Sequence, residues 1–338
     1  MRRNRRAGLA ACCAILALLA AAPGLAQTAE TFPDRPFPDR PFPDRPIRLI
    51  VPYAPGGATD STARLLAGPL GVALGQSVVV ENRTGGSGTI GAGLVVQARP
   101  DGHTLLLDPS AHAVNNVLVR NLPFDYERDF APIARLAVMP LLMVVQPTER
   151  APDLRGFIAA MQALGGRVNW ASAGNGTASH LAGFLFARQA GIEGTHVPYR
   201  GGSQGAQAVV TGDTLFNFAT TPSAIGLVQG GRLRALAVSG AARMALLPEV
   251  PTVAESALPG FALTEWIGVW APVRTPEPVL DRLHAALALA LDGEAMRSRF
   301  GDLGAEPALL PRAAFGRFVT EQRALLGRLA SEAGIRPE

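Results

Sequence analysis

The sequence VPYAPGGATDSTAR, residues 51–64, places a Pro-Gly-Gly turn between an aliphatic strand and a helix. Residues 47–51, IRLIV, have the composition of a buried strand, and residues 61–74 carry apolar side chains at helical spacing. A Gly-rich turn at this junction exposes the unpaired N–H groups of the first helical turn, which bind anions. The stretch therefore predicts an α/β fold with a loop that faces a ligand.

The same alternation of strand and helix is repeated along the chain. Further strands are predicted at residues 77–81, 103–108, 167–173, 195–200, 214–219, 233–239 and 261–273, and helices at residues 91–99, 111–119, 151–164, 179–190, 205–211, from 222 onward, 277–291 and 311–333. Residues 131–147 are predicted to carry two short strands. Because the α/β pattern starts twice, we expect two lobes with mostly parallel sheets, and a chain that leaves the first lobe and returns to it.

The N-terminus has the pattern of an export signal. It has four arginines within the first six residues, an apolar run over residues 7–22 and a small-residue cleavage site that ends at Ala26. A lipid anchor on Cys12 is disfavoured, because the apolar run continues past that cysteine. We therefore expect residues 1–26 to be a signal peptide and the mature protein to be periplasmic. Cys12 and Cys13 are the only cysteines, so the rest of the sequence contains no thiol nucleophile or cysteine metal site.

The basic residues exclude several classes of function. The sequence contains no lysine, which excludes Schiff-base chemistry and the lysine of a Walker A loop. The formal net charge of +4 includes the four N-terminal arginines, so the remainder is near neutral and we expect no nucleic-acid partner. The five histidines show no HxxxH or HxH spacing, so we expect no metal site.

Residues 32–46 repeat the sequence FPDRP three times. Proline at this density prevents a helix or a central strand. We therefore expect residues 27–46 to be an extended, solvated linker ahead of the first strand.

Two motifs indicate enzymes when they are taken alone. GSGTIG at residues 86–91 matches a dinucleotide-binding fingerprint with Asp108 at the ribose-binding distance, but residues 82–85 separate it from its strand, which disfavours NAD. GGSQG at residues 201–205 matches the nucleophile elbow of hydrolases, with Asp281 and His284 following in the order of a triad. However, Asp281 and His284 share one helix, and the strand before Ser203 is polar, and both features disfavour a catalytic triad. A secreted serine hydrolase that uses Ser203 remains the main alternative.

Three Gly-rich loops precede helices, at residues 55–57, 85–89 and 173–179. Each places backbone N–H groups and small side chains at a helix N-terminus, where the helix dipole favours an anion. Phosphate is disfavoured, because no lysine or Mg²⁺-binding set accompanies the loops and Asp60 would oppose a dianion. A carboxylate, which carries one delocalised charge, fits such loops better.

The motifs VPYAPGGATDSTAR, ENRTGGSGTIGA, LPFDYERDFAPIA, ASAGNGTASHLAG, VPYRGGSQGAQAVVTGD and LPEVPTVAES with LPGF follow one another in this order. Together they resemble the Bug family, periplasmic substrate-binding proteins related to the tripartite tricarboxylate transporters. The resemblance covers the chain from about Arg45. It implies an α/β type II periplasmic-binding-protein fold with a ligand cleft between two lobes, which we place at residues 47–143 with 266–338 and at residues 144–265.

The resemblance also implies which residues hold the ligand. One side of the cleft comprises Tyr53, Ala54, Gly56, Gly57 and Asp60, flanked by Gly88 and Thr89. The other side comprises Ser172, Gly174, Asn175, Thr177 and Ser179, flanked by Tyr199 and Arg200. At residues 218–222, FATTP, the chain departs from the acidic or amide residue that relatives commonly carry, so Thr220 and Thr221 stand there instead. This departure favours a dicarboxylate, or an aromatic carboxylate that stacks on Tyr53 or Trp266, over an amino acid.

The sequence therefore predicts a monomeric receptor that binds a small carboxylate by hinge closure and delivers it to the membrane components of a tripartite transporter. We expect it to have no catalytic residues and no cofactor, and not to be an enzyme.

Overall fold

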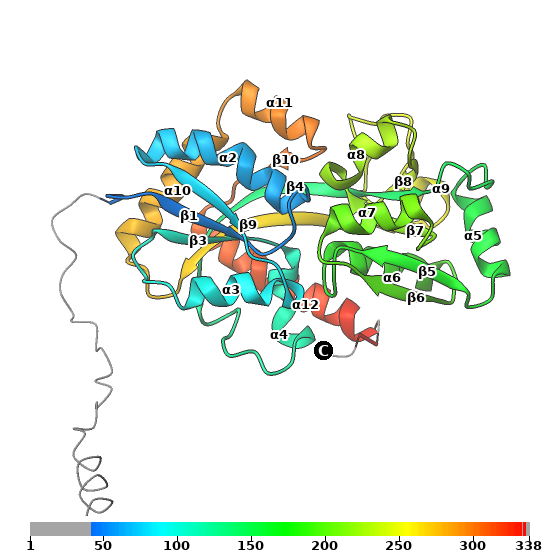
Figure 1. The fold of residues 1–338 in the computed structure, drawn as a ribbon, viewed down its shortest axis with the longest axis horizontal. Coiled ribbons are helices and arrows are strands. Elements are labelled where there is room, and N and C mark those ends of the chain that lie inside the picture. Colours follow the sequence, from blue (N-terminus) through cyan, green and yellow to red (C-terminus); the bar gives the residue numbers. More distant parts are fainter. Residues whose placement is uncertain (1–41, 333, 336–338) are drawn as a thin grey trace, which may run out of the picture. The chain divides into compact units, whose positions relative to one another are not determined.

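The computed structural model describes residues 42–332, 334 and 335. The predicted signal peptide, residues 1–26, and the first two copies of the FPDRP repeat lie outside the described residues. The strands within the described part have the order β2-β1-β3-β9-β4-β7-β5-β6, and β8 and β10 also pair with β4. Two α/β lobes are joined through β4 and β9 (Figure 1).

The first lobe is built on three parallel strands with antiparallel partners. β1 pairs in parallel with β2 and β3, and β9 runs antiparallel to β3. The strands are β1 (Ile47–Val51), β2 (Val78–Asn82), β3 (Thr104–Pro109), β9 (Thr264–Pro272) and β10 (Glu306–Pro307), and the helices are α2 (Ala58–Leu74), η1 (Gly86–Gly88), α3 (Thr89–Val96), η2 (Ser110–Ala113), α4 (Asn115–Leu118), α10 (Glu277–Leu291) and α11 (Glu294–Asp302). Leu66 and Leu70 of α2 and Leu283 and Leu287 of α10 are buried with the aliphatic side chains of β1, so these two helices cover one face of the strands.

The second lobe repeats this layout. β5 (Val168–Ser172) pairs in parallel with β6 (Gly194–Pro198) and with β7 (Phe216–Thr220). The remaining elements are β8 (Arg234–Val238), α5 (Leu154–Ala163), α6 (Ala178–Gln189), α7 (Gly202–Thr211), α8 (Thr221–Gln229) and α9 (Val253–Ser256). The carboxyl ends of β1 and β5 lead through short loops into helices, and β7 runs directly into α8; α/β sheets place ligands at such ends.

β4 (Phe130–Val145) is one strand of 16 residues that both lobes share. Our prediction of two short strands in residues 131–147 is therefore wrong. Pro132 lies at a bulge, where the register against β9 shifts, and Pro140 is the last residue paired with β9. From Leu141 onward β4 pairs with β7 and β8 instead. The two prolines fall where the ladder is irregular or changes partner, so a missing N–H group costs little there.

Two helices differ from the sequence prediction in ways that matter for the site. α2 begins at Ala58 and not at residue 61, which brings Asp60 into the first helical turn. α12 (Arg312–Glu332) packs Phe315 against Trp266 and Trp270, near the start and end of β9. Its last turn reaches the second lobe, where Glu332 pairs with an arginine of α6.

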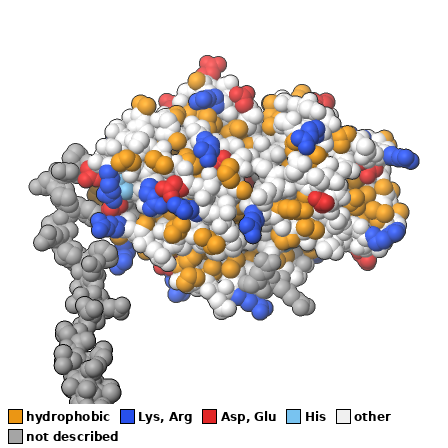
Figure 2. All heavy atoms as spheres, viewed as in Figure 1, with side chains coloured by type: hydrophobic (Ala, Val, Ile, Leu, Met, Phe, Trp, Pro, Cys, Tyr) orange, Lys and Arg blue, Asp and Glu red, His pale blue; other side chains and the backbone are white. Residues whose placement is uncertain are grey.

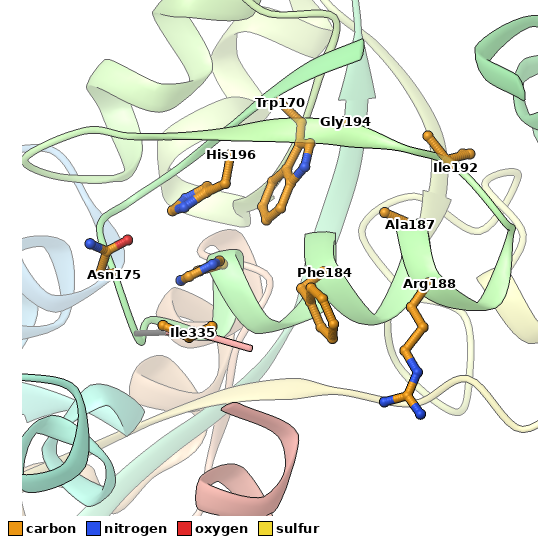
Figure 3. A pocket seen from close by; sticks show the side chains of 10 residues that line it. Trp170, Asn175, Phe184, Ala187, Arg188, Ile192, Gly194, His196 and Ile335 are labelled. Carbon is orange, nitrogen blue, oxygen red and sulfur yellow. The ribbon is translucent and has the colours of Figure 1, made fainter. Parts of the chain in front are cut away.

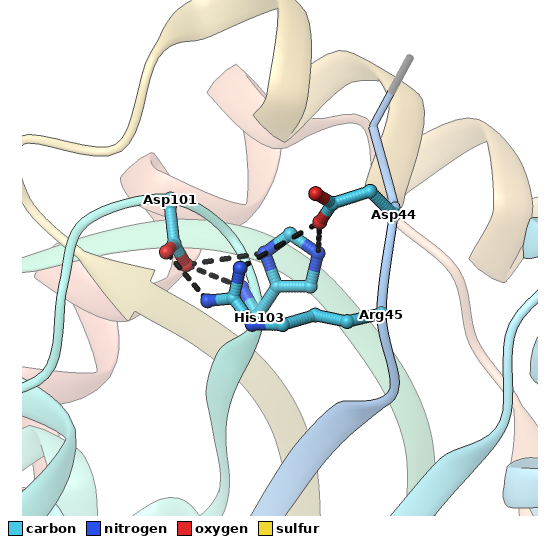
Figure 4. Close-up of polar contacts among 4 residues, drawn as sticks. All are labelled: Asp44, Arg45, Asp101 and His103. Atoms are coloured by element: carbon cyan, nitrogen blue, oxygen red, sulfur yellow. Dashed lines mark hydrogen bonds and ion pairs between the residues drawn. The ribbon is translucent and has the colours of Figure 1, made fainter. Parts of the chain in front are cut away.

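The third FPDRP copy is bound to the first lobe. The ring of Phe42 meets the ring of His103 edge to face, with 5.0 Å between the centroids. Arg45 Nη2 lies 2.7 Å from Asp101 Oδ2, and Asp44 Oδ1 lies 3.2 Å from His103 Nε2 (Figure 4). Residues 42–46 of the predicted linker thus contact the segment before β3, while Asp44, Arg45 and Pro46 remain exposed to solvent.

On the face drawn in Figure 2, arginine side chains are interspersed with acidic and apolar ones. Among the described residues, no helix is both long enough and apolar enough to cross a membrane.

Candidate functional site

The loop between β1 and α2 is held from behind by the carboxylate of Asp60. Asp60 Oδ2 accepts a hydrogen bond from the backbone N–H of Gly56 at 2.9 Å, and Oδ1 accepts one from Asn82 Nδ2 at 3.0 Å. Arg64 Nη2 lies 2.9 Å from the same Oδ1. Asn82 Nδ2 also donates to the carbonyl oxygen of Tyr53 at 3.0 Å. Because donors of its own lobe surround this carboxylate, it braces the turn.

Asp60 is ionised at neutral pH. Burial alone would raise its pKa, but hydrogen bonds from Arg64, from the backbone of Gly56 and from Asn82 outweigh burial and hold the pKa below its ordinary value. The N–H groups in the first turn of α2 have no intrahelical partner and lie at the positive end of the helix dipole. We call residues 53–60, together with Asn82, the first wall.

The Gly-rich loop at residues 85–89 lies against the first wall. The hydroxyl of Tyr53 donates to the carbonyl oxygen of Ser87 at 3.1 Å, and Asn115 Nδ2 donates to the same oxygen at 3.1 Å. A Cβ on Gly88 would lie 3.2 Å from the Tyr53 hydroxyl oxygen. Thr89 begins α3 directly after this glycine. Gly88 thus lies against Tyr53 of the first wall.

The loop between β5 and α6 is held by neutral groups. Ser172 Oγ accepts a hydrogen bond from the backbone N–H of Gly174 at 3.0 Å. Thr177 Oγ1 donates to the carbonyl oxygen of Gly174 at 2.7 Å and accepts from the backbone N–H of His180 at 3.3 Å, so it caps α6. We call residues 172–179, together with His180 and His196, the second wall.

Two stacked imidazoles support the second wall. The rings of His180 and His196 are nearly parallel, with 3.7 Å between centroids and 11° between planes. His196 Nε2 lies 2.6 Å from Ser172 Oγ. Burial lowers the pKa of His180 to about 4, and burial together with the neighbouring His180 lowers the pKa of His196 to about 2. Both rings are therefore neutral at neutral pH.

The two lobes touch at the loops that carry the walls. The backbone N–H of Ala54 donates to the carbonyl oxygen of Arg200 at 3.4 Å. A Cβ on Gly201, whose backbone is extended, would lie 3.1 Å from the Cβ of Ala54. A Cβ on Gly176 would lie 2.6 Å from Leu118 Cδ1, across the other side of the junction. The two lobes are therefore in direct contact here, and a side chain at either glycine would crowd the opposite lobe.

Comparison with known proteins identifies this architecture. Residues 62–335 match the model of the tripartite tricarboxylate transporter family receptors, TctC. The chain belongs to this receptor family. It is a solute-binding protein of the TctC and Bug type, and the family's members are periplasmic binding proteins.

Solved structures of similar proteins agree with the receptor fold. The periplasmic binding protein BugD is 30% identical with a TM-score of 0.83, over 88% of this chain and 100% of BugD. Rpa4515 of R. palustris, solved with adipate, is 31% identical with a TM-score of 0.85, over 88% and 100%. MatC of Rhodopseudomonas palustris, solved with malate, is 33% identical with a TM-score of 0.79, over 85% and 99%. These matches confirm the predicted two-lobed periplasmic-binding-protein fold.

Trp266 is buried against the C-terminal helix α12. Its indole is 2% exposed and packs edge-on against Phe315 and Phe318 of α12. Trp266 Nε1 donates to Gln322 Oε1 at 3.2 Å. The indole is therefore packed between β9 and α12 here, and the role of Trp266 in ligand binding stays a prediction.

Three other predicted ligand residues, Ser179, Thr220 and Thr221, contact side chains of their own lobe. Ser179 Oγ donates to Asn217 Oδ1 at 3.0 Å, and Thr220 Oγ1 lies 2.8 Å from Ser223 Oγ at the start of α8. Thr221 is fully buried with its hydroxyl near a methionine sulfur.

Two predicted residues lie at the edges of the second wall. Tyr199 is tied to this wall by its backbone N–H, which donates to the carbonyl oxygen of Ser172 at 3.1 Å. Asn175 lines a separate pocket, with Trp170 and His196 (Figure 3).

Buried acids beside the receptor's first wall were missed from the sequence. Glu265 Oε1 accepts hydrogen bonds from the backbone N–H groups of Ser110 and Trp266, both at 2.9 Å. Burial raises the pKa of Glu265 to about 7, and Asp108 adds to this rise. Glu265 and Asp108 also raise the pKa of buried Tyr53, behind the dominant effect of burial. The sequence did contain a signal for this buried acid, because Glu265 stands alone within the otherwise apolar run TEWIGVWAP.

The structure removes the support for the two enzyme alternatives. Asp281 Oδ1 pairs with Arg312 at 2.6 Å, and His284 Nδ1 lies 2.9 Å from the carbonyl oxygen of Ile133, so neither is in contact with Ser203. Asp108 is fully buried, with Oδ2 3.0 Å from His112 Nδ1, where no ribose can reach it. Within the described residues, no group of three or more His, Cys, Asp or Glu side chains is placed to hold a metal ion.

Proposed function

We propose that this receptor captures a small organic carboxylate in the cleft between the first and second walls and delivers it to the membrane components of a tripartite transporter. The observation that carries the proposal is the meeting of two helix N-termini from separate lobes. α2 and α7 both begin at Gly-rich loops, and Ala54, before α2, contacts Arg200 and Gly201, before α7. The loop before α6 joins this region through the backbone N–H of Tyr199, which donates to Ser172. Closure excludes water, which strengthens hydrogen bonds from unpaired helix amides to an anion.

The chemistry of the walls supports a carboxylate over a larger anion. The guanidinium of Arg64, which reaches the first wall, is occupied by Asp60. The second wall offers hydroxyl, amide and neutral imidazole groups. Such neutral donors suit one delocalised charge at each end of a ligand. The adipate and malate found in Rpa4515 and MatC are dicarboxylates, which agrees with this reading.

An acid near the first wall also affects which ligand is favoured. Glu265, whose pKa is raised to about 7, is largely protonated below neutral pH. A dicarboxylate therefore meets less repulsion from this group as the pH falls below 7. An aromatic carboxylate also agrees with the proposal, because its ring can stack on that of Tyr53.

The experiment measures carboxylate binding in variants that obstruct closure. Malate, adipate and benzoate are titrated by calorimetry against the wild type, Gly201→Val and Gly226→Val. A side chain at Gly201 meets Ala54 only when the lobes close, so we expect the affinity to fall at least about tenfold, or ~1.4 kcal/mol, with little change in the melting temperature. Gly226 lies in the same lobe with nothing within 4 Å of its Cβ position, and it serves as the control.

The proposal fails if no carboxylate raises the melting temperature of the wild type. A hydrolase would instead cleave small esters, and that activity would disappear in Ser203→Ala. Delivery to a transporter is tested separately, by the loss of carboxylate uptake in cells that lack this receptor.

A further inference from the structure

A pocket of about 450 Å³ lies behind the second wall, between α6 and the strands β5 and β6. Trp170 and His196 point from the strands towards α6, which carries Phe184 and Arg188 (Figure 3). Ile192 and Ile335 add apolar surface to the lining. The volume lies within the range of small-molecule sites, and the lining combines aromatic faces with a few polar groups.

One of the imidazoles presents an N–H donor to this pocket. His180 Nδ1 accepts a hydrogen bond from the backbone N–H of Gly176 at 3.2 Å, so the neutral ring carries its proton on Nε2. The hydroxyl of Ser172 donates to the carbonyl oxygen of Gly174 at 3.2 Å, so at 2.6 Å it accepts a hydrogen bond from His196 Nε2. The ring proton of His196 is therefore used within the second wall.

The Nε2–H group of His180 makes no hydrogen bond within the described part of the chain, although this residue is only 5% exposed. A donor that faces a pocket bonds either water or an acceptor of a ligand. The pocket therefore offers a carboxylate a donor at this imidazole.

A carboxylate of the chain itself already lies at the pocket's rim. Glu332 Oε2, in the last turn of α12, is 2.8 Å from Arg188 Nη1. Both side chains are about half exposed, at 52% and 53%, so their pairing contributes little to stability. A ligand carboxylate can replace that of Glu332 on Arg188 at small cost.

We propose that this pocket is a second binding site, separate from the cleft, for a small aromatic carboxylate. The ring lies against Trp170 and the stacked histidines, and the carboxylate accepts hydrogen bonds from His180 Nε2–H and from Arg188. Because His196 bonds Ser172, occupancy of this site bears directly on the second wall.

The test follows the Cε1–H signals of the histidines by NMR while sodium benzoate is added to the purified protein. We expect saturable shifts of His180 and His196, with His103 and His284 unmoved. Arg188→Gln removes a charged donor and is expected to weaken binding about tenfold, whereas Glu332→Gln frees Arg188 and strengthens binding. Arg167→Gln is the matched control, because Arg167 bonds the carbonyl oxygen of Leu164 outside the pocket.

Three results would overturn the proposal. The first is the absence of saturable shifts in both the wild type and Glu332→Gln. The second is that acetate produces the same shifts as benzoate at equal concentration, which would exclude an aromatic site. The third is that Gly201→Val abolishes the shifts, which would trace them to the cleft. Persistence of the shifts in Gly201→Val supports a second site even if the cleft binds no carboxylate.

Discussion

The first and second walls have the same backbone design but are held by different forces. In the first wall an ionised carboxylate, Asp60, gathers donors from the turn, from α2 and from β2. In the second wall hydroxyls and neutral imidazoles do this work, through Ser172, Thr177 and His196. Each brace loses stability once the unfolded chain gains protons that the folded chain does not, which begins near pH 6.5 for the imidazoles and near pH 3.8 for the carboxylate. The two walls should therefore respond differently to pH and to substitution.

The largest expected effect is that of acid on the second wall. The folded pKa of His180, about 4, lies below its ordinary value of 6.5, so its contribution to stability is complete above pH 6.5 and falls as the pH drops towards 4. Over this interval the wild type should lose about 3 kcal/mol relative to His180→Asn, in which the amide oxygen replaces Nδ1 as acceptor for Gly176. Urea unfolding at each pH measures the difference.

The titration of two other groups, Glu265 and Asp60, does not disturb this comparison between the wild type and His180→Asn. Glu265 titrates in the same interval with the opposite sign, but it is present in both proteins and cancels. Asp60 makes the stability depend on pH only below about pH 3.8, its ordinary pKa, because its pKa is lowered in the fold. Parallel stability curves for the wild type and His180→Asn would contradict the comparison between the walls.

The next effect concerns the brace of the first wall. Asp60→Ala leaves the N–H of Gly56 and the amide of Asn82 without their acceptor, so we expect a loss of about 2 kcal/mol in the free energy of unfolding. Arg64→Gln is the control, since Arg64 is 55% exposed and its ion pair should contribute less than about 1 kcal/mol. If both variants lose the same stability, the ion pair and not the bracing of the turn holds the wall.

The smallest effect is the loss of the neutral cap in the second wall. Thr177→Ala removes the acceptor for the N–H of His180 and the donor to Gly174, and we expect it to cost about 1 kcal/mol. Asp153→Ala, which removes the cap of α5 away from the cleft, should cost about as much. Carboxylate binding should weaken in Thr177→Ala and stay unchanged in Asp153→Ala, and calorimetry distinguishes the two.

The sequence predicted the backbone of both walls but not the groups that hold them. Strand β1 and helix α10 lie where apolar spacing placed them, because such patterns are local. The partnership of Asp60 with Asn82 and the stacking of His180 on His196 join residues far apart in sequence, which spacing alone cannot reveal. The position of Trp266 was unpredictable for another reason: β9 is buried on both faces, so no alternation shows which side its indole takes.

α11 was missed because its nine residues have few apolar side chains. Met296 and Phe300 are its buried residues, and two positions do not define a stripe. The missed acid Glu265 is different, since its isolation within an apolar strand was visible. An ionisable residue in such a run indicates a buried polar cluster, and here the cluster adjoins the first wall.

The return of the chain to the first lobe through β9 has a consequence for the order of folding. β3 and the first part of β4 reach their shared neighbour β9 only after the entire second lobe has been synthesised. The strands β5, β6 and β7, by contrast, come from one continuous stretch of chain. Since distant pairings form slowly and exposed strand edges invite aggregation, we expect the second lobe to fold first and the first lobe to be the part that most needs protection until α10 and α12 arrive.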